Sequence, residues 1–175
     1  MEYGLVALWL ALYLLLAYVG ATVASLLFPR FADRGVAFGL PVALVVLWLV
    51  TYVVGRLSLS AGVWLGLLAL VVAAVAAAKR RDPVDGRAYA EVAAVFSAAF
   101  LFVVWIRAVD PAIAPLAGEK FLDFGLLQSL LRADSLPPED MWFAGEPVAY
   151  YYGGHLLAAI LTRLTGTAGQ YAYNL

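Results

Sequence analysis

Glu119 and Asp123 are two carboxylates whose type and spacing could do chemistry, because they lie four residues apart. On a helix, residues at this spacing share one face. Two carboxylates on one face can bind a divalent cation that prefers oxygen ligands, such as Mg²⁺ or Mn²⁺. Alternatively, one of them can act as a general base toward an acceptor hydroxyl. The competing interpretation is a solvated acidic turn in which Lys120 balances part of the charge.

Both carboxylates belong to an acid-rich segment, residues 110–149, which holds seven of the twelve acidic residues of the chain. A loop of about 40 residues is longer than an ordinary connection, and such loops are usually functional or disordered. Apolar residues recur within it at helical spacing, at Leu122, Leu126, Leu127, Leu130 and Leu131. The pattern predicts a short amphipathic helix over residues 121–133, lying on the outer surface of the membrane and ended by Pro137 and Pro138.

Asp140 and the aromatic residues that follow it are candidate binding residues. Asp140 lies in a turn-forming stretch, and Trp142 comes two residues later, so the two could shape a pocket at the membrane mouth. Tyr150, Tyr151 and Tyr152 are typical of an aromatic belt at a membrane interface. Consecutive residues of a helix project in different directions, however, so at least one of these tyrosines should face protein or a cavity.

His155 and Arg107 complete the set of candidate residues. His155 is the only histidine of the chain and lies about one turn inside an apolar stretch. Because ionisable groups in membranes rarely face lipid, its side chain is expected to face the interior of the helix bundle, in a structural or a functional role. Arg107 ends another apolar stretch, and it should extend its charge to the membrane surface or pair with a phosphate there.

The elements that must position these residues are membrane helices. The chain has 175 residues, of which 65% are hydrophobic and 13% are charged. Crossing a hydrocarbon core of roughly 30 Å takes about 20 apolar residues. Stretches of suitable composition occupy residues 3–28, 36–55, 61–78, 89–109 and 150–164. We therefore expect an all-α, polytopic transmembrane bundle with about five spans.

Composition also excludes several classes of function. The chain has no cysteine, so it has no disulfide framework, thiolate chemistry or cysteine-ligated metal. No Lys/Arg-rich patch is interleaved with aromatic residues, which argues against nucleic-acid binding. Residues 3–28 lack a charged preceding region and are too long for the apolar part of a signal peptide, so we expect a membrane span instead.

The basic residues predict how the chain is oriented. Lys79, Arg80 and Arg81 form the strongest basic cluster, and such clusters favour the cytoplasmic side. With residues 79–87 inside, the N-terminus and the acid-rich segment lie outside the plasma membrane. The predicted organisation is four transmembrane helices in residues 1–109, an extracytoplasmic acidic loop in residues 110–149, and a fifth transmembrane helix with the start of a further segment in residues 150–175.

Five short motifs resemble the N-terminal part of the YYY family, which comprises large and very hydrophobic membrane proteins of archaea and bacteria. They are FPRFADRG at 28–35, GEKFLDF at 118–124, PPEDMWFAG at 137–145, YYYGG at 150–154 and YAYNL at 171–175. The family pattern usually reads EKPMDF and DPWFAG, so the chain departs from it at Phe121, Leu122 and Met141. Family members are several times longer, which implies that the 175 residues are a fragment.

That family is similar in layout to the GT-C class of membrane glycosyltransferases, which use sugars linked to a lipid phosphate. The resemblance implies that Glu119 and Asp123 form the acidic motif of such an enzyme, with Asp123 as its base or metal ligand. It further implies a polyprenyl-phosphate sugar as donor, with substrate-binding residues among Arg107, Asp140, Trp142, Tyr150, Tyr151, Tyr152 and His155.

Two other classes of function stay open at this point. A transporter or channel could use His155 and the tyrosines to line a path, although the first three apolar stretches carry almost no charge. A non-catalytic subunit of an envelope assembly would need none of the acidic residues.

Overall fold

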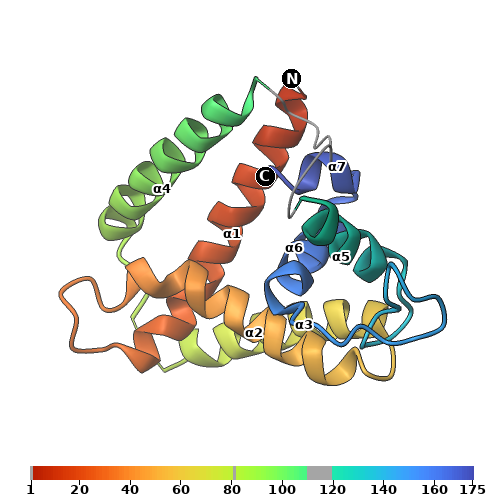
Figure 1. Ribbon diagram of the computed structural model, residues 1–175. Helices are drawn as coiled ribbons and strands as arrows, with labels where there is room; N and C mark the ends of the chain where they lie inside the picture. The colour runs from red at the N-terminus through yellow and green to blue at the C-terminus, as the bar shows by residue number, and fades with distance from the viewer. Residues whose placement is uncertain (1, 81, 110–119) are drawn as a thin grey trace.

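The computed structural model describes residues 2–80, 82–109 and 120–175, and it is built from helices alone (Figure 1). In chain order the helices are α1 (Tyr3–Leu27), the 3₁₀ helix η1 (Val36–Phe38), α2 (Gly39–Val54), α3 (Leu59–Ala78), α4 (Gly86–Arg107), α5 (Lys120–Arg132), α6 (Gly153–Thr165) and α7 (Gly169–Ala172). Within these ranges the only pairing of β type is an isolated bridge between Glu139 and Pro147. The predicted all-α class is confirmed.

Four helices are long and apolar enough to cross a membrane: Tyr3–Leu27, Val36–Val54, Leu59–Ala78 and Gly86–Arg107. They correspond to the first four predicted spans. The predicted fifth span, residues 150–164, is not among them and stays a prediction. The tyrosines at 150–152 precede the helix, and α6 has only 13 residues. At 1.5 Å per residue it is roughly 20 Å long, which is shorter than the hydrocarbon core.

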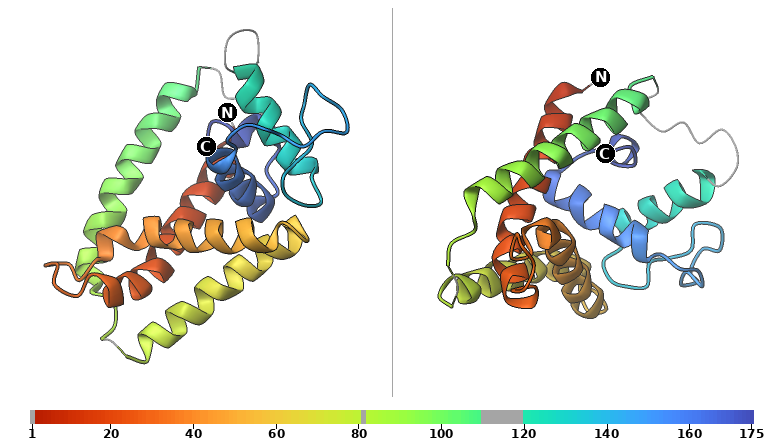
Figure 2. Two further views of the ribbon diagram at one scale, coloured as in Figure 1. Left: turned by 60° about the horizontal axis from the view of Figure 1, so that its bottom comes forward. Right: turned by 90° about the vertical axis from the view of Figure 1, so that its left-hand side faces the viewer.

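Small residues let α1, α2 and α3 approach closely, as is common in membrane helices. A Cβ atom at Gly20 of α1 would collide with the carbonyl oxygen of Gly39 at the start of α2. Between α2 and α3, the Thr51 hydroxyl donates to the Gly62 carbonyl oxygen at 3.2 Å. Figure 2 shows that α4 stands apart from this trio. It is held to α1 partly by a 2.8 Å hydrogen bond from the Tyr89 hydroxyl to the Leu14 carbonyl oxygen.

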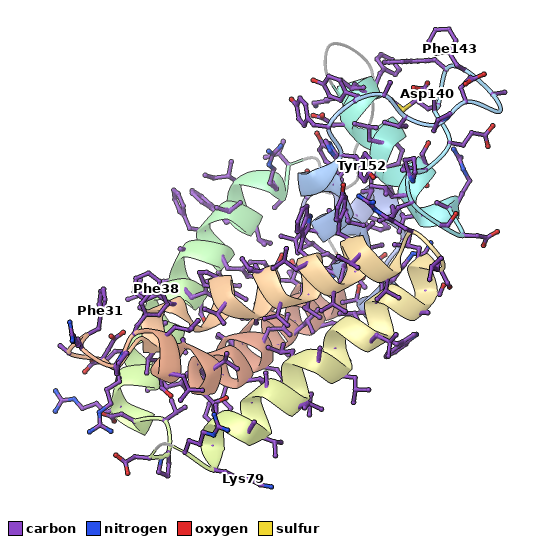
Figure 3. The ribbon with its side chains drawn as sticks, turned by 90° about the horizontal axis from the view of Figure 1, so that it is seen from below. Phe31, Phe38, Lys79, Asp140, Phe143 and Tyr152 are labelled. Atoms are coloured by element: carbon purple, nitrogen blue, oxygen red, sulfur yellow. The ribbon has the colours of Figure 1, made fainter. Side chains whose placement is uncertain are left out.

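The two basic connections meet at one end of the bundle. Arg34, in the connection before α2, forms a 2.9 Å ion pair with Asp82, in the connection before α4. In Figure 3 Phe31 and Lys79 lie at this end, and Asp140 and Phe143 lie at the opposite end. The described part of the acid-rich segment, residues 120–149, and the basic connections are therefore separated by the length of the membrane helices, and we call these two ends of the bundle the acidic end and the basic end.

At the acidic end, α5 and α6 lie side by side in both views of Figure 2. The predicted amphipathic helix is confirmed as α5, and its apolar face packs against α6. Leu127 and Leu130 of α5 are buried in one core cluster with Leu156 and Ile160 of α6. A second apolar helix covers this face, which the periodicity of α5 alone could not reveal.

Hydrogen bonds fasten this pair of helices to the membrane bundle. The backbone N–H of Leu59 donates to the Asp134 carbonyl oxygen, and that of Leu136 donates to the Gly55 carbonyl oxygen, both at 2.7 Å. Beyond α6, the Trp9 indole N–H of α1 donates to the Thr167 hydroxyl at 2.8 Å. The segment around α5 and α6 is thus held against the ends of α1, α2 and α3.

Candidate functional site

Asp123 stands in the first turn of α5 and has polar partners from two other segments. One carboxylate oxygen, Oδ1, lies 3.3 Å from Nε2 of His155. The other, Oδ2, accepts a hydrogen bond from the Tyr173 hydroxyl at 3.3 Å. The Asp123 side chain keeps 34% of its surface exposed, and that of His155 keeps 20%. A carboxylate is therefore held from two sides and still reachable from solvent.

Three elements bring this cluster together. Asp123 and His155 meet because the first turns of α5 and α6 lie next to each other, and Tyr173 follows directly after α7. The Tyr173 ring also packs edge-on against Phe124, with ring centres 6.4 Å apart. We call Asp123, His155 and Tyr173 the carboxylate cluster.

The second nitrogen of His155 indicates how its ring is used. Nδ1 is buried and has no hydrogen-bond partner in the part of the chain that the structure describes. The Asp123 carboxylate oxygen accepts hydrogen bonds, so this contact needs the hydrogen on Nε2. The tautomer with its hydrogen on Nε2 fits best, because it donates to Asp123 and leaves Nδ1 as an acceptor.

Arg163 fixes the other end of the same helix pair. From the last turn of α6, its guanidinium donates to the carbonyl oxygens of Leu130, Leu131 and Ala133 at the end of α5, at 2.9 to 3.1 Å. It also donates to the Ser60 hydroxyl of α3 at 3.0 Å. Burial lowers the pKa of Arg163, and the negative charge of the nearby Asp134 offsets only part of this effect. With His155 at one end and Arg163 at the other, α6 is tied to α5 at two points.

The predicted pair of carboxylates can be followed only in part, because Glu119 lies outside the described residues. Among residues 2–80, 82–109 and 120–175, no three His, Asp or Glu side chains come together as a metal-binding group. Asp123 could supply one carboxylate to Mg²⁺ or Mn²⁺, which also accept water and substrate phosphates as ligands. The metal with its two ligands, Glu119 and Asp123, stays a prediction.

The Asp140 side chain stabilises the turn in which it lies. Its Oδ1 accepts hydrogen bonds from the backbone N–H groups of Trp142 at 2.8 Å and Phe143 at 3.2 Å. Trp142 itself is 63% exposed. With Ser129 and Arg132 of α5, both residues line a cavity of about 360 Å³ beside the second half of that helix. The first turn of α5, which carries Asp123, is not part of this lining.

The three tyrosines divide into two environments. Tyr150 and Tyr151 are exposed, with ring centres 4.2 Å apart. Tyr152 packs against the core, which confirms that at least one of the three faces protein. Burial raises the pKa of Tyr152, Tyr52 raises it further, and Arg56 lowers it. In Figure 3 Tyr152 lies at the start of α6, and Asp140 and Phe143 lie further out on the loop.

Arg107 is exposed at the end of α4. It borders a small cavity of about 30 Å³ together with Glu2 of the N-terminus and Tyr171 of α7. The neighbouring Glu2 brings a negative charge to this place. The structure therefore puts Arg107 beside the chain termini, and none of the hydrogen bonds of the described residues connects it to the carboxylate cluster.

Sequence reasoning did not single out Tyr173 and Arg163. Tyr173 belongs to the YAYNL motif at 171–175, but nothing in that motif points to a carboxylate 50 residues earlier. Arg163 carried a clearer signal. An arginine in an otherwise apolar helix has to find acceptors for its N–H groups, and here the end of α5 supplies them.

Comparison with known proteins identifies the family of the chain. A family model described as an uncharacterized membrane protein, DUF2298, matches residues 42–175. The match includes the whole carboxylate cluster, Arg163 and three of the four candidate spans, the first of these three from Val42 onward. Neither the curated proteins nor the solved structures gave a match. The chain belongs to the membrane protein family DUF2298.

Proposed function

We propose that the protein takes part in glycosyl transfer from a sugar linked to a lipid phosphate, with Asp123 as the base. The observation that carries the proposal is the carboxylate cluster, in which His155 and Tyr173 hold Asp123 while a third of its side chain stays exposed. The resemblance to membrane glycosyltransferases supplies the reaction class. A shared layout alone does not establish an activity, so the proposal depends on the cluster.

In the proposed step, an acceptor hydroxyl attacks the anomeric carbon of the sugar. The bond between the acceptor oxygen and this carbon forms, and the bond from the carbon to the phosphate oxygen breaks. Asp123 takes the hydroxyl proton, and the lipid phosphate leaves with the bonding electrons. General-base catalysis by a positioned carboxylate typically contributes 10² to 10⁴ in rate.

His155 and Tyr173 act on the position of the base. Each contacts one oxygen of Asp123, so together they restrict rotation of the carboxylate about its Cβ–Cγ bond. A base contributes only when it lies within hydrogen-bonding distance of the proton that it removes. Holding both oxygens reduces the conformational freedom that would otherwise be lost on reaching the transition state.

The location of the cluster also suits a lipid-linked donor. The α5–α6 pair is fastened to the ends of the membrane helices, by the hydrogen bonds of Leu59 and Leu136 among others. A donor whose tail remains in the bilayer presents its phosphate at this level. Asp123 and His155 lie on helices outside the four candidate spans, which favours surface chemistry over a relay inside the membrane.

The proposal includes the orientation predicted from charge, with the cluster on the outer side of the plasma membrane. The two basic connections and residues 120–149 of the acid-rich segment lie at opposite ends of the bundle, which is the arrangement that this orientation needs. Mg²⁺ or Mn²⁺ at Glu119 and Asp123 would help to neutralise the leaving phosphate, but no step above depends on a metal.

Asp123→Asn in the full-length protein tests the proposal. The amide keeps the size of the side chain but is far too weak a base. We expect sugar transfer from a radiolabelled polyprenyl-phosphate sugar to fall about 100-fold or more. Glu146→Gln is the matched control, because Glu146 is an exposed carboxylate of the same acid-rich segment. Wild-type transfer by Asp123→Asn would refute the proposal.

A further inference from the structure

Arg56 is an exposed arginine just beyond the end of α2. It lies two residues beyond the candidate span Val36–Val54, at the depth where lipid phosphates are found. Its side chain is exposed. None of the ion pairs formed by the described residues involves it. The guanidinium therefore keeps its charge available for a ligand.

Aromatic residues hold this guanidinium in place. Arg56 lies over the Tyr52 ring, 5.0 Å from its centre, and donates to the Tyr52 hydroxyl at 3.0 Å. Tyr52 in turn stacks on Trp48, with ring centres 5.1 Å apart and the rings 3° from parallel. The contact with the Tyr52 hydroxyl uses one of the five N–H donors of the guanidinium, so the others remain for a ligand. A planar fork of N–H donors held this way suits two oxygens of a phosphate.

The same residues connect Arg56 to the helix that carries His155. The Trp48 indole N–H donates to the Gly153 carbonyl oxygen in the first turn of α6, at 2.8 Å. Tyr152, next to Gly153, lies within electrostatic reach of both Tyr52 and Arg56. A Cβ atom added at Gly154 would meet no atom within 4 Å, so there is open space beside this turn. Arg56 is thus connected through Tyr52 and Trp48 to the first turn of α6, the turn in which His155 contacts Asp123.

An exposed apolar stripe runs along α2 toward Arg56. Val45, Leu49 and Val53 are 55%, 50% and 65% exposed and follow one another at intervals of four residues. Leu49 directly follows Trp48 and Val53 directly follows Tyr52, while Val45 lies three positions before Trp48, so the two series run next to each other along the helix. An acyl or prenyl chain lying on this stripe would bring its phosphate to Arg56.

We propose that Arg56, supported by Tyr52, binds the phosphate of a lipid headgroup whose tail lies along Val45, Leu49 and Val53. This deepens the proposed function and rests on it for the identity of the lipid as the glycosyl donor or its released phosphate. The assignment favours Arg56 over Arg107, because Arg107 shares its cavity with the carboxylate Glu2.

Binding of decyl phosphate to the full-length protein in a neutral detergent tests the assignment. A charge-assisted, two-pronged contact is worth tenfold or more in affinity, so we expect Arg56→Gln to raise the Kd at least about tenfold. Arg56→Lys should give an intermediate value, because an ammonium group lacks the planar fork. Arg107→Gln is the matched control and should stay within about twofold of the wild type.

Three results would overturn the assignment. They are unchanged binding by Arg56→Gln, an equal loss in Arg107→Gln, and equal affinity for inorganic phosphate and decyl phosphate in the wild type. The last result would show that a free anion is bound and the apolar stripe plays no part. Unfolding temperatures are measured for Arg56→Gln and Arg56→Lys as a control. Values equal to that of the wild type show that a loss of binding is not caused by a loss of the fold.

The assay separates this inference from the proposed function, because decyl phosphate carries no sugar. If Arg56→Gln binds normally and Asp123→Asn still lacks transfer activity, the lipid site is wrong and glycosyl transfer survives. If Arg56→Gln loses binding and Asp123→Asn retains transfer activity, the lipid site is right and Asp123 is not the base.

Discussion

Nε2 of His155 lies 3.3 Å from Oδ1 of Asp123, although the two residues are 32 positions apart and stand on different helices. The contact exists because α5 and α6 run next to each other with their first turns at the same level, and Arg163 ties their last turns together. A carboxylate near the surface of a membrane protein thereby becomes a positioned group.

Removing the imidazole should weaken the function of Asp123. We expect His155→Leu to lower the rate of sugar transfer about 10-fold to 100-fold, because the carboxylate loses the donor at one oxygen. His155→Gln, which can still donate an N–H, should retain more activity. Initial rates at saturating donor measure the effect. Equal rates for His155→Leu and the wild type would show that the contact does not position the base.

Arg163 should matter for stability. Arg163→Met removes a cation that serves three carbonyl oxygens at the end of α5, and we expect the free energy of unfolding to fall by about 2 kcal/mol. Arg87→Met is the control, since Arg87 forms an ion pair with Glu91 on the exposed surface and such pairs contribute under about 1 kcal/mol. Denaturant unfolding in detergent micelles compares the two. Equal losses would mean that the α5–α6 connection is not specially stabilising.

The contact between α1 and α2 should not tolerate a methyl group. In Gly20→Ala the new Cβ collides with the Gly39 carbonyl oxygen, and forcing the helices apart should cost about 1–3 kcal/mol. Gly4→Ala has open space around the new atom and should be neutral or slightly stabilising. Thermal unfolding of both variants tests this. A stable Gly20→Ala variant would contradict the close approach.

The absence of cysteine from the chain allows a direct test of orientation. Ala144→Cys places a thiol on the exposed loop at the acidic end, and Ala32→Cys places one in the basic connection at the other end. In intact cells a membrane-impermeant maleimide should label Ala144→Cys, and it should label Ala32→Cys only after the membrane is opened. The reverse pattern would invert the proposed orientation.

Much of the fold follows from local patterns. Four uninterrupted apolar stretches predicted the four candidate spans, and the spacing of Leu126, Leu127 and Leu130 predicted α5. For the apolar stretch at 150–164, the predicted start of the helix was wrong. The apolar pattern placed the tyrosines at 150–152 inside the helix, whereas the helix begins at Gly153. One face of this helix packs against α5.

The site was harder to predict. Asp123 and His155 were both candidates by residue type, but their pairing depends on how α5 packs against α6. That arrangement is tertiary, and no spacing within either helix encodes it. Tyr173 was missed because its role depends on Asp123, a neighbour that is distant in the sequence. Arg56 was missed because its role depends on its position at the end of a candidate span.

The most direct test of the proposed function compares Asp123→Asn with Glu146→Gln in the full-length protein, with both variants inserted in the membrane to the wild-type level. Transfer from a radiolabelled polyprenyl-phosphate sugar should fall about 100-fold or more in Asp123→Asn and stay unchanged in Glu146→Gln. Transfer by Asp123→Asn at the wild-type rate would contradict the assignment of Asp123 as the base.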